Sequence, residues 1–110
     1  MPKHRVLVIG GGSIGERHLR CFLKTDDADV SLCEINPEVR DRIAANYSLS
    51  GCFDDLSTAL AARPELVVVC TPAHLHIDQS IECAKAGAHL LIEKPLSTTF
   101  GRIDELLAVV

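Results

Sequence analysis

The chain has 110 residues, of which 47% are apolar and 24% are charged, and its net charge is −4. This length and composition fit one ordinary globular domain and are small for a complete two-domain enzyme. The mild acidity argues against binding to nucleic acid or to an anionic membrane through bulk charge, and no apolar run approaches the ~20 residues that cross a bilayer.

The first predicted element is a short strand, Arg5 to Ile9, that runs directly into the glycine motif G-x-G-x-x-G. Gly10 permits a tight turn, Gly12 lets the backbone approach a pyrophosphate, and Gly15 lets the next helix press against the sheet. That helix, predicted from Ser13 to Lys24, would direct its free N–H groups and positive dipole end at the phosphates. The candidate contacts to a dinucleotide in this loop are therefore Gly10, Gly12, Ser13, Ile14 and Gly15.

A second strand, predicted from Asp29 to Glu34, ends in a carboxylate. Glu34 lies 19 positions after Gly15, close to the offset of about 20 at which an acid accepts hydrogen bonds from the adenosine ribose. The carboxylate would repel a 2′-phosphate and no arginine follows directly, so the sequence favours NAD over NADP. The alternative is a strand–helix–strand unit that binds nothing, in which the glycines only make a turn and Glu34 is solvated.

The alternation of helices and strands continues along the chain. Asn36 is expected to cap a helix from Pro37 to about Tyr47, because proline is preferred at the first helical position. A short strand is predicted at residues 51–53, and either Asp54 or Asp55 is expected to cap the helix that follows.

The continuous apolar run at residues 65–70 predicts a strand that is buried on both faces of a parallel sheet. A helix at about 74–86 follows, with Gly87 as its stop, and another strand is predicted at 88–93. A last helix is expected from about Thr99, with one apolar face formed by Ile103, Leu106, Leu107 and Val110.

Strands that alternate with helices predict an α/β fold with a doubly wound parallel sheet, in the order 3-2-1-4-5. A sixth strand normally completes such a sheet, and the chain ends in the helix that should lead into it. We therefore expect residues 1–110 to form a dinucleotide-binding domain that lacks its last strand and a second domain.

The five cysteines are odd in number and contain no C-x-x-C pair. We interpret them as small core residues in a reducing cytoplasm, rather than as a redox or metal site. His74 and His76 are two positions apart, so on a helix they would diverge and make poor joint metal ligands. No metal is expected.

Three segments, residues 8–18, 70–76 and 86–96, resemble the glucose–fructose oxidoreductase, inositol dehydrogenase and rhizopine-catabolism (Gfo/Idh/MocA) family. The first contains the glycine motif, the second is similar to the family's T-P-x-x-x-H, and the third contains its E-K-P. Their order and spacing agree with the family, so the likeness covers essentially the whole chain. Two departures are Ala73, where the family often has asparagine, and Ala88, where it often has lysine.

The resemblance implies a Rossmann-like domain of an NAD(P)-dependent enzyme that oxidises or reduces a hydroxyl or carbonyl of a sugar, cyclitol or related small molecule. It implies that Lys94 reaches the active site beside the nicotinamide, where an ammonium stabilises negative charge on a substrate oxygen. It also implies that Thr71, Pro72 and His76 line the middle of the cofactor and that Glu93 lies near the nicotinamide.

From the residues alone, plainer roles stay open. Lys94 would be a solvated lysine paired with Glu93, and His76 would cap or pack at the start of a helix. The family's second domain supplies most of the substrate pocket and the acid/base residues, so the 110 residues alone are expected to be inactive, and members are often homo-oligomers. The main alternative function is a non-catalytic nucleotide-binding sensor or scaffold. A methyltransferase-like domain is a further alternative, against which the E-K-P segment argues.

Overall fold

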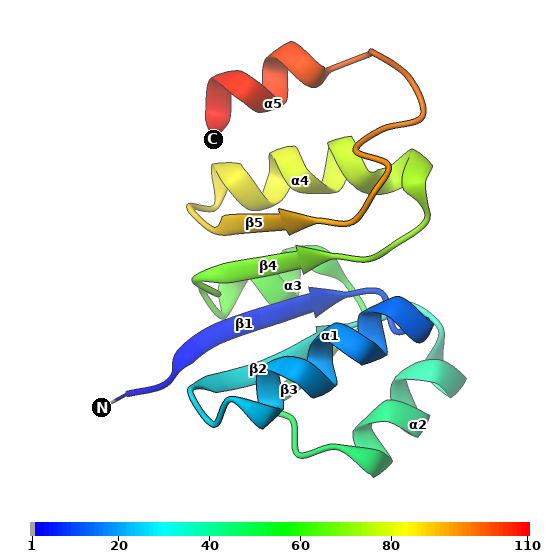
Figure 1. Cartoon of the computed structure of the whole chain (residues 1–110), viewed down its shortest axis with the longest axis vertical. Helices are drawn as coiled ribbons and strands as arrows, with labels where there is room; N and C mark the ends of the chain where they lie inside the picture. Colours follow the sequence, from blue (N-terminus) through cyan, green and yellow to red (C-terminus); the bar gives the residue numbers. More distant parts are fainter. Residues whose placement is uncertain (1) are drawn as a thin grey trace.

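The computed structural model describes residues 2–110. Its strands are His4–Ile9 (β1), Ala28–Cys33 (β2), Gly51–Phe53 (β3), Leu66–Val69 (β4) and His89–Ile92 (β5). Its helices are Ser13–Lys24 (α1), Pro37–Asn46 (α2), Leu56–Ala61 (α3), His76–Lys85 (α4) and Ile103–Val109 (α5), with a 3₁₀ turn at Ala73–Leu75 (η1). The strands form one parallel sheet in the order β3-β2-β1-β4-β5, which confirms the predicted topology (Figure 1).

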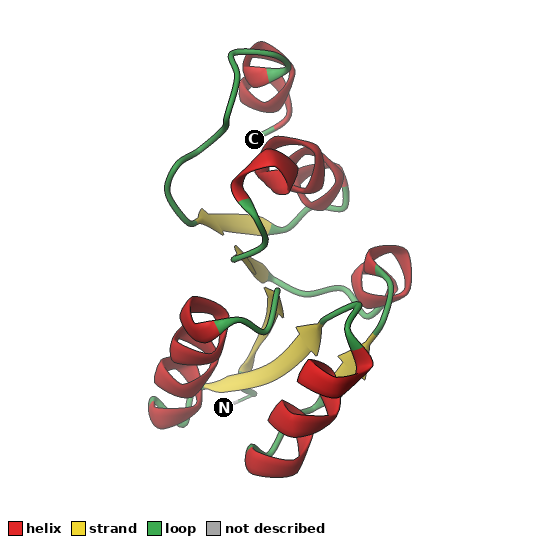
Figure 2. Ribbon diagram, turned by 90° about the vertical axis from the view of Figure 1, so that its right-hand side faces the viewer, coloured by secondary structure: helices red, strands yellow, loops and turns green. Residues whose placement is uncertain are grey.

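Successive residues of β1 point to opposite faces of the sheet and so belong to two different cores. Val6 and Val8 pack in the core on the side of α1 and α2, together with Leu19 of α1. Leu7 and Ile9 pack in the core on the side of α3 and α4. Helices therefore lie on both sides of the sheet (Figure 2), as expected when parallel strands are joined by right-handed crossovers.

Local signals fix where several helices begin and end. The side chain of Asn36 accepts hydrogen bonds from the backbone N–H groups of Glu38 and Val39, so it caps α2 as predicted. Asp55, rather than Asp54, caps α3 by accepting from the N–H of Ser57. Gly87 follows α4 with a φ of 89°, a left-handed conformation that favours glycine.

The last helix differs from its prediction. It begins at Ile103 instead of about Thr99, because the preceding residues form a turn in which Arg102 has a φ of 65°. Leu106 is buried against α4, but Leu107 and Val110 are 65% and 69% exposed. Successive residues of a helix point about 100° apart, so this short helix presents only one side to α4, and the wider apolar face that we expected is not buried.

The remaining elements begin and end close to the predicted residues. The helix expected from about residue 74 begins as η1, and its regular part starts at His76. Cys70 comes just after β4 and is partly buried. In residues 2–110, none of the helices combines the length and the apolar character that a membrane crossing demands.

Candidate cofactor site

A cleft of about 720 Å³ opens where β1, β2 and β4 end. Gly10 and Gly12 line it from the glycine loop, Glu34 from the end of β2, and Thr71 and Pro72 from the end of β4. In an open parallel sheet ligands bind beyond the carboxyl ends of the strands, at the point where the strand order reverses. Here that point lies between β1 and β4, and the structure brings these five residues together around it.

Two of the three motif glycines are required by packing inside the protein. A Cβ atom on Gly15 would lie 1.8 Å from the carbonyl oxygen of Gly10, so only glycine allows α1 to approach the loop this closely. Gly10 has a φ of 96°, and a Cβ atom there would lie 2.8 Å from the carbonyl oxygen of Cys70. The predicted packing role of Gly15 and the tight turn at Gly10 are confirmed.

Gly12 differs from both, because a Cβ atom on it would meet no protein atom within 4 Å. The space beside it is open, and no contact within the described residues explains why the position is glycine. Gly12 is also the N-cap residue of α1, and no side chain caps this helix. The free N–H groups of the first turn are therefore available for an anion.

Ser13 and Ile14 form the start of that first turn. Both are exposed, Ile14 by 47%, and their side chains do not line the cleft. A contact from these residues to a phosphate would therefore come from their backbone N–H groups.

The Glu34 carboxylate is held in place by two backbone groups. Its Oε1 accepts a hydrogen bond from the N–H of Gly11 at 2.7 Å, and its Oε2 accepts one from the N–H of Asn36 at 2.9 Å. These bonds tie the end of β2 to both the glycine loop and the start of α2. A carboxylate has about four acceptor positions, so two remain open to donors from a ligand.

Arg40 supports this site from outside the lining of the cleft, a role that the sequence did not reveal. Its guanidinium donates a hydrogen bond of 2.8 Å to the backbone oxygen of Glu34. No arginine follows Glu34 directly in the sequence, but the first turn of α2 brings Arg40 back from six positions further along. Only the folded helix places it there.

The wall after β4 is held by side chains from α4. The Thr71 hydroxyl donates to Oε1 of Gln79 at 2.5 Å, and Gln79 itself lines the cleft. His76 is only 2% exposed, and its Nε2 and Nδ1 lie 2.6 Å and 2.8 Å from the carbonyl oxygens of Thr71 and Pro95. His76 therefore does not line the cleft as the family resemblance led us to expect. It packs behind the wall, where each ring nitrogen lies beside a backbone oxygen and the single N–H of a neutral imidazole can donate to one of them.

Glu93 and Lys94, at the end of β5, lie outside the lining of this cleft. Oε1 of Glu93 accepts a hydrogen bond of 2.9 Å from Nε2 of His18 on α1, and this bond lowers the pKa of Glu93. Lys94 is exposed, and its ammonium makes no hydrogen bond or ion pair with residues 2–110. The plain alternative of a Glu93–Lys94 pair is therefore not what the structure shows. The peptide bond between Lys94 and Pro95 is cis.

Two cysteines, Cys33 and Cys70, also line the cleft. Burial raises the pKa of Cys33 to about 11 and that of Cys70 to about 12, so both are neutral thiols at pH 7. All five cysteines are free, but Cys21 and Cys52 are exposed, so the expectation that the cysteines are small core residues is wrong for these two. Across residues 2–110, histidine, cysteine and acidic side chains nowhere form a group of three or more that could hold a metal ion.

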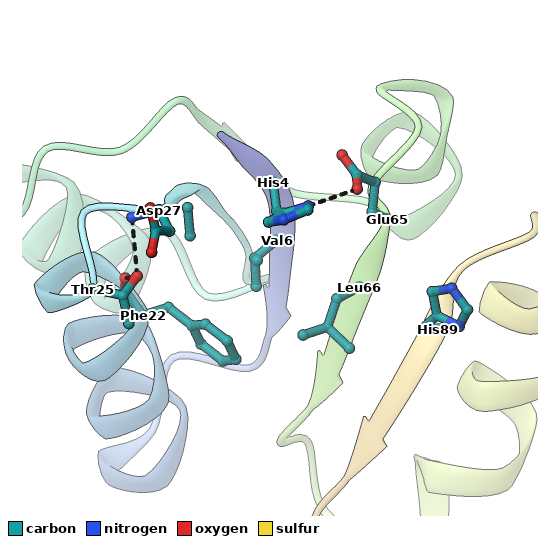
Figure 3. Close-up of a pocket in the computed structure, with 9 residues that line it drawn as sticks. His4, Val6, Phe22, Thr25, Asp27, Glu65, Leu66 and His89 are labelled. Carbon is teal, nitrogen blue, oxygen red and sulfur yellow. Dashed lines mark hydrogen bonds and ion pairs between the residues drawn. The ribbon is translucent and has the colours of Figure 1, made fainter. Parts of the chain in front are cut away.

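A second cavity, of about 520 Å³, lies at the opposite end of the sheet (Figure 3). Phe22 of α1 and His89 of β5 lie on its two sides, with Val6 and Leu66 between them. At its rim, Nδ1 of His4 lies 3.0 Å from Oε2 of Glu65. The cavity is formed at the amino ends of the strands, away from the glycine loop and Glu34, so it does not belong to the candidate cofactor site.

Comparison with known proteins gives a consistent result. The sequence profile of the Gfo/Idh/MocA family, described as an oxidoreductase family with an NAD-binding Rossmann fold, matches residues 4–110. The chain is 32% identical over 105 residues to 4-carboxy-2-hydroxymuconate-6-semialdehyde dehydrogenase of a Sphingobium species, which is 94% of this chain and 33% of that protein. It is 31% identical over 106 residues to inositol 2-dehydrogenase of Rhizobium meliloti, which is 94% of this chain and 31% of that protein.

Among solved structures, the WlbA dehydrogenase from Bordetella pertussis, in complex with NADH and UDP-GlcNAcA, has a TM-score of 0.88 and 30% identity. The match covers 99% of this chain and 33% of that one. The chain thus spans about a third of the length of the relatives it matches.

Proposed function

Because this chain belongs to the Gfo/Idh/MocA family of oxidoreductases with an NAD-binding Rossmann fold, we propose that it is the cofactor domain of a dehydrogenase. The reaction is the transfer of a hydride between a nicotinamide cofactor and a hydroxyl or carbonyl group of a sugar, cyclitol or related small molecule. One observation supports this most strongly: the open space at Gly12, beside an uncapped helix N-terminus, faces the same cleft as the Glu34 carboxylate.

The pyrophosphate would bind at the glycine loop. The backbone N–H groups of Ser13, Ile14 and Gly15 stand at the positive end of the α1 dipole, which favours an anion. The open space at Gly12 leaves room for phosphate oxygens close to the backbone. Gly10 and Gly15 would contribute by shaping the loop, since their neighbours inside the protein exclude any side chain.

The adenosine ribose would bind at Glu34, which favours NAD over NADP. Both carboxylate oxygens are held by backbone N–H groups, so the side chain is not free to swing away from a 2′-phosphate. Bound NADP would therefore place two negative charges next to each other, while the ribose hydroxyl groups of NAD would donate to the remaining acceptor positions.

The nicotinamide would extend past Thr71 and Pro72 toward the end of β5, where Glu93 and Lys94 follow the strand. We propose that Lys94 acts there as a catalytic residue by donating to the substrate oxygen that gains negative charge as hydride leaves or arrives. Its ammonium makes no ion pair with the described residues 2–110, although the charge of the neighbouring Glu93 attracts it. The hydride chemistry itself belongs to the cofactor.

Calorimetric titration of the 110-residue chain with NAD, NADH, NADP and NADPH tests the cofactor assignment. We expect binding of NAD and NADH and weaker binding of both phosphorylated forms. The variant His89→Gln is a matched control, because His89 lies in the cavity at the other end of the sheet and its replacement should leave all four affinities unchanged. A folded chain that binds none of the four would contradict the proposal.

Replacement of Lys94 by alanine tests its catalytic role in the dehydrogenase that contains this domain. Loss of charge stabilisation in the transition state typically costs about 100-fold or more in kcat, while NADH affinity should fall by about tenfold or less, the effect of one lost contact. Equal losses in kcat and in NADH affinity would instead mean that Lys94 only helps to bind the cofactor.

A further inference from the structure

The two residues that flank Lys94 are each held by a histidine. Nε2 of His18 lies 2.9 Å from Oε1 of Glu93, and Nδ1 of His76 lies 2.8 Å from the backbone oxygen of Pro95. His18 is on α1 and His76 is the first residue of α4. These helices pack on opposite faces of the sheet, so the segment that carries Lys94 is held from both sides.

The His18–Glu93 contact joins segments that lie 75 positions apart in sequence. A carboxylate only accepts hydrogen bonds, so Nε2 of His18 carries the proton in this bond. The two side chains are 27% and 30% exposed, and the bond lowers the pKa of Glu93, which keeps its carboxylate charged. The pair therefore persists at neutral pH as a charge-assisted hydrogen bond.

The His18–Glu93 contact also bears on why Lys94 has no ion-pair partner among residues 2–110. Glu93 is the acid adjacent to Lys94 in sequence, and its carboxylate is already engaged by His18. Lys94 is left exposed without an ion pair among residues 2–110. Without His18, the Glu93 carboxylate would be free to turn toward the ammonium beside it, since opposite charges a few ångströms apart attract.

We infer that His18 is a positioning residue for Lys94, which it orients by holding Glu93 against α1 while His76 holds Pro95 from the other face. This inference rests on the proposed function, because it concerns the end of the cofactor site where the nicotinamide would bind. α1 also carries the glycine loop at its N-terminus, and His76 also contacts the oxygen of Thr71 at 2.6 Å. His18 thus links the segment around Lys94 to the helix that carries the pyrophosphate loop, and His76 lies between that segment and the cleft wall.

The test compares NADH with ADP-ribose, which has the same adenosine and pyrophosphate groups but no nicotinamide. Affinities for the 110-residue chain are measured by calorimetry with His18→Ala, with His18→Gln, with Lys94→Ala and with the double variant H18A/K94A. Glutamine places an amide N–H near the position of Nε2 and should preserve the bond to Glu93. His89→Gln, on the strand that precedes Glu93, is the control, and circular dichroism confirms that each variant is folded.

We expect H18A to weaken NADH binding about three- to tenfold, because Lys94 drawn toward Glu93 would lose its contact at the nicotinamide end of the site, and one such contact is typically worth this much. ADP-ribose affinity should stay within about twofold, because its proposed contacts on α1 come from backbone N–H groups of the first turn, which the substitution of the His18 side chain leaves in place. H18Q should bind NADH like the wild type, and H18A should cost nothing more when Lys94 is already alanine.

Two results would overturn the inference alone: equal losses for NADH and ADP-ribose in H18A, or an undiminished effect of H18A in the K94A background. Either would show that His18 supports the fold in general and does not act through Lys94. If the folded wild-type chain binds neither ligand, the proposed function is wrong, and the inference falls with it.

Discussion

The glycine loop offers a pair of substitutions that separate folding from cofactor binding. In Gly15→Ala the new methyl group would lie 1.8 Å from the backbone oxygen of Gly10, more than 1 Å inside the normal contact distance. Because the oxygen is a backbone atom and the methyl carbon is fixed rigidly to the backbone of α1, the helix or the loop must move. In Gly12→Ala the methyl group meets no protein atom within 4 Å, and the residue has a φ of −67° that alanine adopts readily.

The two substitutions should therefore change the free energy of unfolding by different amounts. Overpacking of this kind costs about 1–3 kcal/mol or more, only partly offset by the gain of up to about 1 kcal/mol when alanine replaces glycine in a helix. G15A should therefore lower the free energy of unfolding by about 1–3 kcal/mol, which corresponds to roughly 4–20 °C in Tm for a domain of this size. In G12A the loss of a favourable N-cap residue and the lower entropy of the unfolded chain are each about 1 kcal/mol or less and oppose each other.

Thermal unfolding and NADH titration of both variants test this reasoning. G12A should unfold within a few degrees of the wild type and lose NADH affinity by about tenfold or more, since the methyl group occupies space needed by the pyrophosphate. G15A should be destabilised whether or not a cofactor is present. The reasoning is refuted if G12A binds NADH like the wild type, or if G15A is as stable as the wild type.

Three further substitutions or treatments test other parts of the structure. Glu34→Ala should weaken NADH binding about tenfold or more and NADPH binding less; an unchanged ratio of the two affinities would contradict the role of Glu34. Alkylation at pH 8 should modify the exposed Cys21 long before the buried Cys83, whose pKa is raised to about 12, and mass spectrometry of the products checks this order. The hydrogen bond from Arg42 lowers the pKa of Glu16 below 4.5, so it stabilises the fold above that pH and the benefit disappears as the carboxylate is protonated. Urea unfolding should therefore show less acid sensitivity in Glu16→Gln than in the wild type, and equal sensitivity would rule the bond out.

Most of the fold could be predicted because its signals are local. The apolar run before the glycine motif, the caps at Asn36 and Asp55 and the stop at Gly87 each act within a few residues of the element they define. The last helix lacked such a signal. Gly101 and the left-handed conformation of Arg102 delay its start, and its apolar residues follow helical spacing whether or not a neighbour covers them.

The residues of the candidate site also fall into those that the sequence could assign and those that it could not. The motif glycines and Glu34 could be assigned from sequence because backbone geometry and strand ends constrain them. Gln79, Arg40 and His18 could not, since each acts on a residue that only the folded chain brings near; for His18 that residue is 75 positions away. The motif identified His76, but the expectation that it lines the cleft was wrong, because spacing alone does not say which way a helical side chain points.

The contacts around the cleft explain how it can be shaped before a ligand arrives. Glu34 ties the end of β2 to the glycine loop, Gln79 and His76 hold the wall after β4, and His18 holds the end of β5. Each of these bonds forms inside the protein, so the entropy lost in ordering the loops is part of folding and does not reduce the affinity for a ligand. Gly12 is the exception among the described glycines of the loop, because its surroundings are open. That combination of fixed walls and one open backbone position is the arrangement expected of a preformed site for a pyrophosphate.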